Sequence, residues 1–257
     1  MTDSTITYML LAMAAFAAGA VNSIAGGGTL LTFPALLAVI SPVAANATST
    51  IALLPGSIAS AWGYRAELSH TRVMLRRLWL PSLLGGALGA LAVTRFPERV
   101  FASLIPWLLV LASSLLLLQR PVARWLGTHP HDKPKSSTTT AIILFQFLVG
   151  IYGGYFGAGI GILMLSTLGF MGISDIHHMN GLKTVLAVII NAVTVVIFLV
   201  EGAVVWQYAF AMIASSVVGG YIGARLARRM PAAVVRYIVV CIGFAVAGYS
   251  FYKRFSG

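Results

Sequence analysis

The stretch Asn22-Ser23-Ile24-Ala25-Gly26-Gly27-Gly28-Thr29-Leu30-Leu31-Thr32-Phe33-Pro34 decides the fold, because three consecutive glycines interrupt an apolar run. A second stretch, Gly150-Ile151-Tyr152-Gly153-Gly154-Tyr155-Phe156-Gly157-Ala158-Gly159-Ile160-Gly161-Ile162-Leu163, repeats the pattern in the other half of the chain. In lipid, each unpaired backbone N–H or C=O group costs several kcal/mol. We therefore expect other protein, water or a ligand to cover both breaks.

Composition places the chain in a membrane. Of its 257 residues, 59% are hydrophobic and 9% are charged, whereas soluble domains carry roughly 45–50% apolar and about 25% charged residues. The net charge of +11 would suggest nucleic acid in a soluble chain. Here we attribute it to cytoplasmic loops, where membrane proteins concentrate Lys and Arg, and expect no nucleic-acid partner. The single cysteine, Cys241, excludes an internal disulfide.

Ten apolar segments run along the whole length and predict an all-α, multi-pass protein of the bacterial inner membrane. Several approach the ~20 residues that cross the bilayer, and the two short ones each follow a glycine break. The segments are 5–24, 29–40, 45–63, 78–94, 100–119, 139–156, 160–173, 179–200, 205–225 and 232–252.

A polar stretch divides the chain into two repeats within one transmembrane domain. We assign residues 1–119 to the first repeat, 120–138 to a connector and 139–257 to the second repeat. Three blocks align between the halves in the same order and at a nearly constant offset, which indicates duplication. The matched blocks are 25–28 with 158–161, 46–50 with 180–184, and 82–90 with 216–224.

The charges of equivalent loops predict that the repeats are inverted. The loop after the third segment carries Arg65, Arg72, Arg76 and Arg77, whereas its equivalent carries only Glu201. Because basic loops face the cytoplasm, equivalent loops then lie on opposite sides of the membrane. The connector is then cytoplasmic and both termini lie outside, although Lys253 and Arg254 near the C-terminus oppose this assignment.

An inverted repeat must cross the membrane an odd number of times. Three spans per half suffice if each glycine-broken pair forms a re-entrant hairpin, and five crossings also satisfy the charges. We prefer the hairpin because the second arm is only about 20 Å long. Pairs of glycines at helical spacing, such as Gly85 with Gly89 and Gly219 with Gly223, suit close helix–helix contact within the chain or in a homodimer.

The glycine breaks are the predicted site. A helix that begins inside the membrane presents free N–H groups and the positive end of its dipole to an anion, a recurring design in transporters with inverted repeats. Alternatively, glycine only permits a kink or tight packing. Our candidate substrate-binding residues are Asn22, Gly26, Gly27, Gly28, Thr29, Asn46, Ser49, Gly157, Gly159, Gly161, Asn180, Lys183 and Asn191.

Three polar residues after the breaks carry most of the expected chemistry. Asn46 and Asn180 occupy equivalent positions, and we expect at least one of them to contact substrate. Lys183 is the basic residue that lies within a span, where a charge usually indicates function. It can neutralise an anion, or it can extend to the membrane interface from the start of its helix.

No nucleophile–base set, nucleotide-binding loop or metal motif is visible, so the sequence predicts neither an enzyme nor a bound cofactor. None of the six acidic residues lies in the middle of a span. Coupling to protons is open, and Asp175 with His177 and His178 is a proton-responsive cluster or a solvated loop.

The motifs resemble the sulfite exporter TauE/SafE family over nearly the whole chain. The resemblance rests on Ala25-Gly26-Gly27-Gly28, on 153–161, and on the Asn46-Ala47-Thr48-Ser49 and Asn180-Gly181-Leu182-Lys183 blocks. It implies export or import of sulfite, organosulfonates such as sulfoacetate, or related small oxyanions, and we expect a secondary transporter that works as an exporter. A passive anion channel of the same fold and a non-transporting membrane assembly partner are the alternatives.

Overall fold

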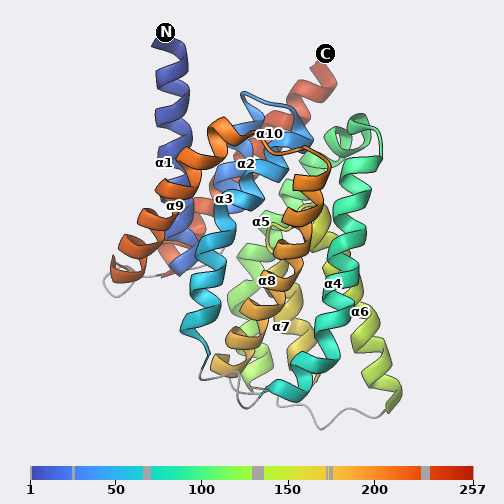
Figure 1. Ribbon diagram of the computed structural model, residues 1–257. Helices are drawn as coiled ribbons and strands as arrows, with labels where there is room; N and C mark the ends of the chain where they lie inside the picture. The colour runs from blue at the N-terminus through green and yellow to red at the C-terminus, as the bar shows by residue number, and fades with distance from the viewer. Residues whose placement is uncertain are drawn as a thin grey trace.

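A computed structural model describes residues 2–24, 27–65, 71–128, 136–171, 173, 176–226 and 232–256. The described residues form ten α-helices and no strand (Figure 1). The helices are α1 (Thr2–Ile24), α2 (Thr29–Leu37), α3 (Pro42–Gly63), α4 (Arg72–Arg95), α5 (Glu98–Thr128), α6 (Ser136–Tyr155), α7 (Ile160–Phe170), α8 (Ile176–Val200), α9 (Trp206–Leu226) and α10 (Ala232–Ser256).

The all-α prediction is confirmed, and each predicted apolar segment overlaps one helix. The short second arms are α2, with 9 residues, and α7, with 11 residues. Neither reaches the ~20 residues needed to cross the bilayer. The connector assignment 120–138 stays a prediction; within it, α5 continues past Pro121 to Thr128 and α6 begins at Ser136. A proline within a helix removes one hydrogen bond, and this proline does not end α5.

The exposed surface confirms a multi-pass membrane protein. Among the described residues, four helices are long and apolar enough to cross a membrane, and they contain Thr5–Asn22, Arg72–Arg95, Glu98–Leu118 and His178–Val200. Large apolar side chains face outward from several helices, as with Trp107, Phe210 and Leu148. Polar side chains such as Asn46, Thr32 and Gln146 are buried instead. This inside–outside pattern suits lipid, in which apolar groups need no burial.

Helices of one half pack against helices of the other in equivalent pairs. Helix α1 contacts α9 as α6 contacts α4, and α3 contacts α9 as α8 contacts α4. Figure 1 shows both chain termini at the top of the view, where α1 begins, whereas α6 begins at the bottom. The side of the membrane that each end faces, and with it the inverted repeat, stays a prediction.

The paired glycines pack the two halves together within this chain. A Cβ atom at Gly85 or Gly89 of α4 would overlap a backbone carbonyl of α6, that of Phe147 or Ile151 respectively. A Cβ atom at Gly219 of α9 would overlap the carbonyl oxygen of Phe16 in α1. Glycine therefore sets the closest approach of both helix pairs, as small residues do at helix interfaces in lipid.

Candidate functional site

At the first glycine break, a side chain of the preceding helix accepts a hydrogen bond from the backbone. Asn22 lies near the end of α1, and its Oδ1 accepts a hydrogen bond of 2.8 Å from the Gly28 N–H. Gly27 has a φ of 91°, in the left-handed region that glycine adopts without strain. Helix α2 then begins at Thr29. Asn22 thus satisfies one of the amides that the start of a helix leaves without an intrahelical partner.

At the second break, a side chain donates a hydrogen bond to the backbone, whereas at the first break a side chain accepts one from it. Gly157 and Gly159 have φ values of 77° and 78°, so both need the conformational freedom of glycine. The Tyr152 hydroxyl donates a hydrogen bond of 2.6 Å to the carbonyl oxygen of Ala158. Helix α7 begins directly afterwards at Ile160, with Gly159 before its first turn.

Lys183 lies beside the start of α7. Its Nζ donates a hydrogen bond of 2.9 Å to Asn180 Oδ1, one turn earlier on α8. A Cβ atom built on Gly161 would lie 3.4 Å from Lys183 Cδ and 4.0 Å from its Nζ. The ammonium group is therefore next to the positive end of the α7 dipole. Three predicted site residues, Gly161, Asn180 and Lys183, come together here.

Asn46, in the first half of the chain, forms a hydrogen bond with the backbone at the second break. It lies on α3 and is 1% exposed, and its Nδ2 donates a hydrogen bond of 3.0 Å to the carbonyl oxygen of Tyr155. Its Oδ1 has no hydrogen-bond partner among the described residues. Ser49, one turn further on, is also buried, and its Oγ lies 2.6 Å from Thr32 Oγ1 of α2.

Both breaks lie against the same turn of α5. A Cβ atom at Gly27 would lie 2.8 Å from Leu116 Cδ2, and one at Gly159 would lie 3.1 Å from the Ala112 carbonyl oxygen. One helical turn advances about 5.4 Å, so a single short stretch of α5 adjoins the two breaks.

Aromatic rings fill the space between α2 and the second break. The ring of Phe33 packs edge-on against those of Phe156 and Phe101, with centroid distances of 5.2 and 6.2 Å. Phe101 also packs against Tyr155 at 5.3 Å. Phe33, Phe101 and Phe156 are almost completely buried. We call Phe33, Phe101, Tyr155 and Phe156 the aromatic cluster.

The contacts given above involve neither Asn191 nor Thr29, which were also predicted as site residues. Asn191 lies on α8, eleven residues beyond Asn180 and therefore about 16 Å further along the helix. Thr29 is the first residue of α2 and is half-buried. Gly26 lies outside the described residues.

Sequence reasoning missed Tyr152, Thr32 and the aromatic cluster. A tyrosine within a span was the available signal for Tyr152, because a buried hydroxyl group needs a hydrogen-bond partner.

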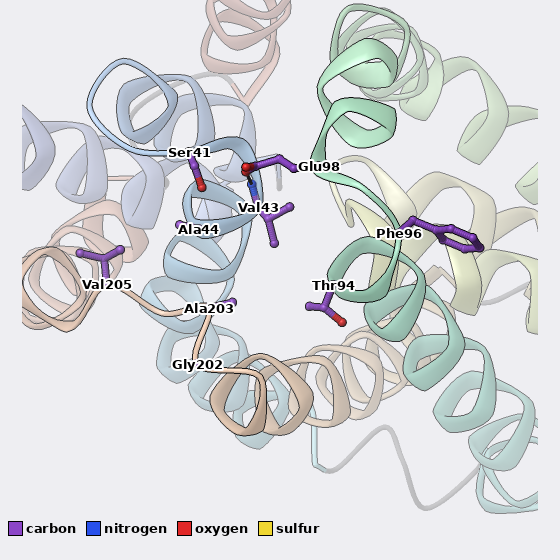
Figure 2. Close-up of a pocket in the computed structure, with 9 residues that line it drawn as sticks. All are labelled: Ser41, Val43, Ala44, Thr94, Phe96, Glu98, Gly202, Ala203 and Val205. Carbon is purple, nitrogen blue, oxygen red and sulfur yellow. Dashed lines mark hydrogen bonds between the residues drawn. The ribbon is translucent and has the colours of Figure 1, made fainter.

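A pocket of about 410 Å³ lies at one end of the bundle (Figure 2). Three turns meet around it, namely those between α2 and α3, between α4 and α5, and between α8 and α9. It is lined by Ser41, Val43, Ala44, Thr94, Phe96, Glu98, Gly202, Ala203 and Val205.

Two polar contacts join the turns around the pocket. Figure 2 shows Glu98 reaching across to the start of α3, where its Oε1 accepts a hydrogen bond of 3.1 Å from the Val43 N–H. Next to the pocket, Arg95 forms an ion pair of 2.6 Å with Glu201. Asn46 follows the pocket-lining Ala44 on α3, and Phe101 follows Glu98 on α5, so both lie within about one turn of the lining.

Comparisons with known proteins give one consistent result. Residues 11–250 match the family described as sulfite exporter TauE/SafE. A probable membrane transporter protein of Haemophilus influenzae is 29% identical over 93% of this chain and 92% of its own length. Probable membrane transporter protein ORF9 of Sinorhizobium sp is 31% identical, with coverages of 94% and 92%. Probable membrane transporter protein YfcA of Escherichia coli K12 is 29% identical, with coverages of 93% and 87%. No solved structure matches the chain significantly.

Proposed function

Because this chain belongs to the sulfite exporter TauE/SafE family, we propose that it is a secondary transporter that exports small sulfur-containing anions. Sulfite and organosulfonates are the substrate class. The substrate binds between the two glycine breaks, and alternating access carries it across the bacterial inner membrane. The sulfur chemistry of this proposal rests on the family, and the preference for an anion rests on the site.

The position of Lys183 carries the proposal. Its ammonium group lies near Gly161 in the first turn of α7, where the helix dipole is also positive. An anion between them would meet positive charge on both sides. A sulfonate or sulfite oxygen accepts hydrogen bonds from both an ammonium group and backbone amides. Asn180 Oδ1 accepts a hydrogen bond from the Lys183 ammonium group and holds it at this position.

The pocket and the aromatic cluster support alternating access. The pocket is the proposed mouth on one side of the membrane, and the aromatic cluster separates it from the second break. In this conformation the rings of Phe33, Phe101 and Phe156 are almost completely buried, and we assign this arrangement to the closed state of the path. Transport then requires these rings to separate, together with the contact of Asn46 with Tyr155.

Replacing Lys183 by alanine tests the proposed site. We expect Lys183→Ala to weaken ethanesulfonate and sulfite binding by about ten-fold or more, because a hydrogen bond to a charged group contributes about 1.5–3 kcal/mol. Lys183→Arg keeps the charge and should retain part of the affinity. Binding is measured by thermal stabilisation of the purified protein, and transport by flux into liposomes. Arg76→Ala, which removes an exposed charge, is the matched control and should behave like the wild type.

Unchanged anion binding in Lys183→Ala would show that the substrate binds elsewhere. The same liposomes separate a carrier from a channel, because carrier flux saturates with substrate and channel flux does not. Imposed pH gradients test proton coupling, which is a further part of the proposal. A homodimer, also proposed, is tested by the mass of the purified protein in detergent.

A further inference from the structure

We propose that Asn46 Oδ1 and the carboxyl end of α6 form a binding site for a positively charged group beside the anion site. The group is either a monovalent cation such as sodium or an ammonium group on the substrate itself. This inference rests on the proposed function, because the positive group would accompany the transported anion. Its basis is a buried oxygen atom that has no donor among the described residues.

The orientation of the Asn46 amide is fixed by its neighbour. Its Nδ2 donates to the carbonyl oxygen of Tyr155, and a carbonyl oxygen can only accept. Turning the amide over would place two acceptors against each other. The Oδ1 atom is therefore the unpartnered one, and it is buried in a residue that is 1% exposed. An unsatisfied buried polar atom is unfavourable, so a donor or cation is expected to meet it.

The surrounding backbone favours positive charge. Tyr155 is the last residue of α6, so its carbonyl belongs to the negative end of a helix dipole. The final carbonyls of a helix also have no partner within that helix. Broken helices in transporters use these two kinds of end differently, with carbonyl ends for cations and amide ends for anions. At the second break, α6 supplies the carbonyl end and α7 supplies the amide end.

The other half of the chain shows what such an amide oxygen accepts. Asn180 is the repeat equivalent of Asn46, and the following threonines make matching hydrogen bonds. Thr50 Oγ1 donates to the Asn46 carbonyl at 2.8 Å, and Thr184 Oγ1 donates to the Asn180 carbonyl at 2.7 Å. Asn180 Oδ1 accepts a hydrogen bond from the ammonium group of Lys183.

In the first half, Ser49 stands where Lys183 stands in the second, and its hydroxyl lies against Thr32. The second half therefore carries its own positive group beside Asn180, the ammonium of Lys183, whereas the first half carries none at the matching position beside Asn46. A bound cation or a substrate ammonium group would occupy that position.

Two matched comparisons test this site in purified wild-type protein at constant ionic strength. The first compares thermal stabilisation by sodium chloride with that by N-methylglucamine chloride. The second compares the affinity of 2-aminoethanesulfonate with that of ethanesulfonate in sodium-free buffer. A sodium-specific stabilisation identifies a cation site. An affinity about ten-fold higher for the amino compound identifies a substrate ammonium site, since one charge-assisted hydrogen bond has about this effect.

Asn46→Leu should abolish whichever difference the wild type shows. Gln146→Leu is the matched control, because Gln146 is also buried, donates to Ser82 through Nε2 and has an unpartnered Oε1. It should retain the wild-type difference. If the wild-type protein responds neither to sodium nor to the amino group of the substrate, the inference is overturned and water is the partner of Asn46 Oδ1. This outcome is measured on the wild type, so it stands even if Asn46→Leu does not fold.

The two proposals fail in different ways. If ethanesulfonate binds, its affinity equals that of 2-aminoethanesulfonate, and sodium has no effect, only the cation site is contradicted. Sodium stabilisation without any sulfonate binding contradicts the proposed function and leaves the cation site standing.

Discussion

At each glycine break, one side chain forms a hydrogen bond with the backbone; it accepts this bond at the first break and donates it at the second. Asn22 accepts a hydrogen bond from Gly28, six residues later, and Tyr152 donates one to Ala158, also six residues later. In each case the last turns of one helix satisfy the backbone that leads into the next. Glycine supplies the geometry of the break, and a polar side chain makes that geometry tolerable in lipid.

Removing the side chain that closes the first break should lower stability more than substrate affinity. We predict that Asn22→Ala lowers the free energy of unfolding by about 0.5–2 kcal/mol, the usual effect of losing a side chain that caps a helix start. The reason is that the Gly28 amide loses its acceptor. Thermal unfolding in detergent measures the change, and anion affinity measured on the same samples should stay near the wild-type value.

Asn22→Asp is the informative companion, because a carboxylate retains the acceptor and suits the positive start of α2. It should recover most of the lost stability. If Asn22→Ala instead keeps its stability and loses anion binding, Asn22 contacts substrate, as its position in the sequence had suggested.

The candidate site was predictable where residue type alone identifies chemistry. A lysine within a span and two asparagines at positions related by the predicted repeat are unusual in lipid, so Lys183, Asn180 and Asn46 could be named as candidates from the sequence. The partner of each was not predictable, because Asn46 contacts Tyr155 from the other half of the chain. The place of Asn191 in the site stays a prediction, since it lies on α8 about 16 Å beyond Asn180.

Helices were the most predictable level of this structure. Apolar length identifies a membrane helix directly, because lipid permits few other backbone conformations. Helix ends were less predictable, as α5 shows by continuing to Thr128 through polar residues. Pairing between helices depends on which glycines face a neighbour, and spacing alone does not specify the partner. Gly85 and Gly89 could have served an interface between chains, whereas they pack α4 against α6.

Enlarging a glycine between α4 and α6 should therefore destabilise the fold. We predict that Gly89→Ala lowers the free energy of unfolding by about 1–3 kcal/mol, the usual range for an overpacked contact. The added methyl group would overlap the Ile151 carbonyl oxygen and lie 2.6 Å from the Tyr155 amide nitrogen. Both are backbone atoms, so the helices must separate.

Gly56→Ala is the control for helix propensity. A Cβ atom at Gly56, within α3, meets nothing within 4 Å, and alanine in a helix is favoured over glycine by roughly 0.5–1 kcal/mol. We expect no loss of thermal stability for this variant. Equal melting temperatures for Gly89→Ala and Gly56→Ala would contradict close packing of α4 on α6.

At the scale of the whole bundle, the pocket brings together three turns that the sequence could only assign to the same side of the membrane. The charge pattern predicts that the turn after α2, the turn after α4 and the loop after α8 lie outside the cytoplasm. The structure brings residues of all three around one pocket. The ion pair between Arg95 and Glu201 also joins two of them, although an exposed pair adds little stability. The basic residues that oppose this assignment, Lys253 and Arg254, lie near the end of α10.

Cysteine labelling tests the orientation of the bundle, because one thiol can be placed at each end. In a Cys241→Ser background, we predict that Ser41→Cys at the pocket reacts with a membrane-impermeant maleimide added to intact spheroplasts. Arg76→Cys, exposed near the start of α4, should react only after the membrane is permeabilised, since basic flanks face the cytoplasm. The reverse pattern would place the pocket and both termini in the cytoplasm and would make Lys253 and Arg254 the better topological signal. If substrate slows the labelling of Ser41→Cys without slowing that of Arg76→Cys, the pocket also lies on the transport path.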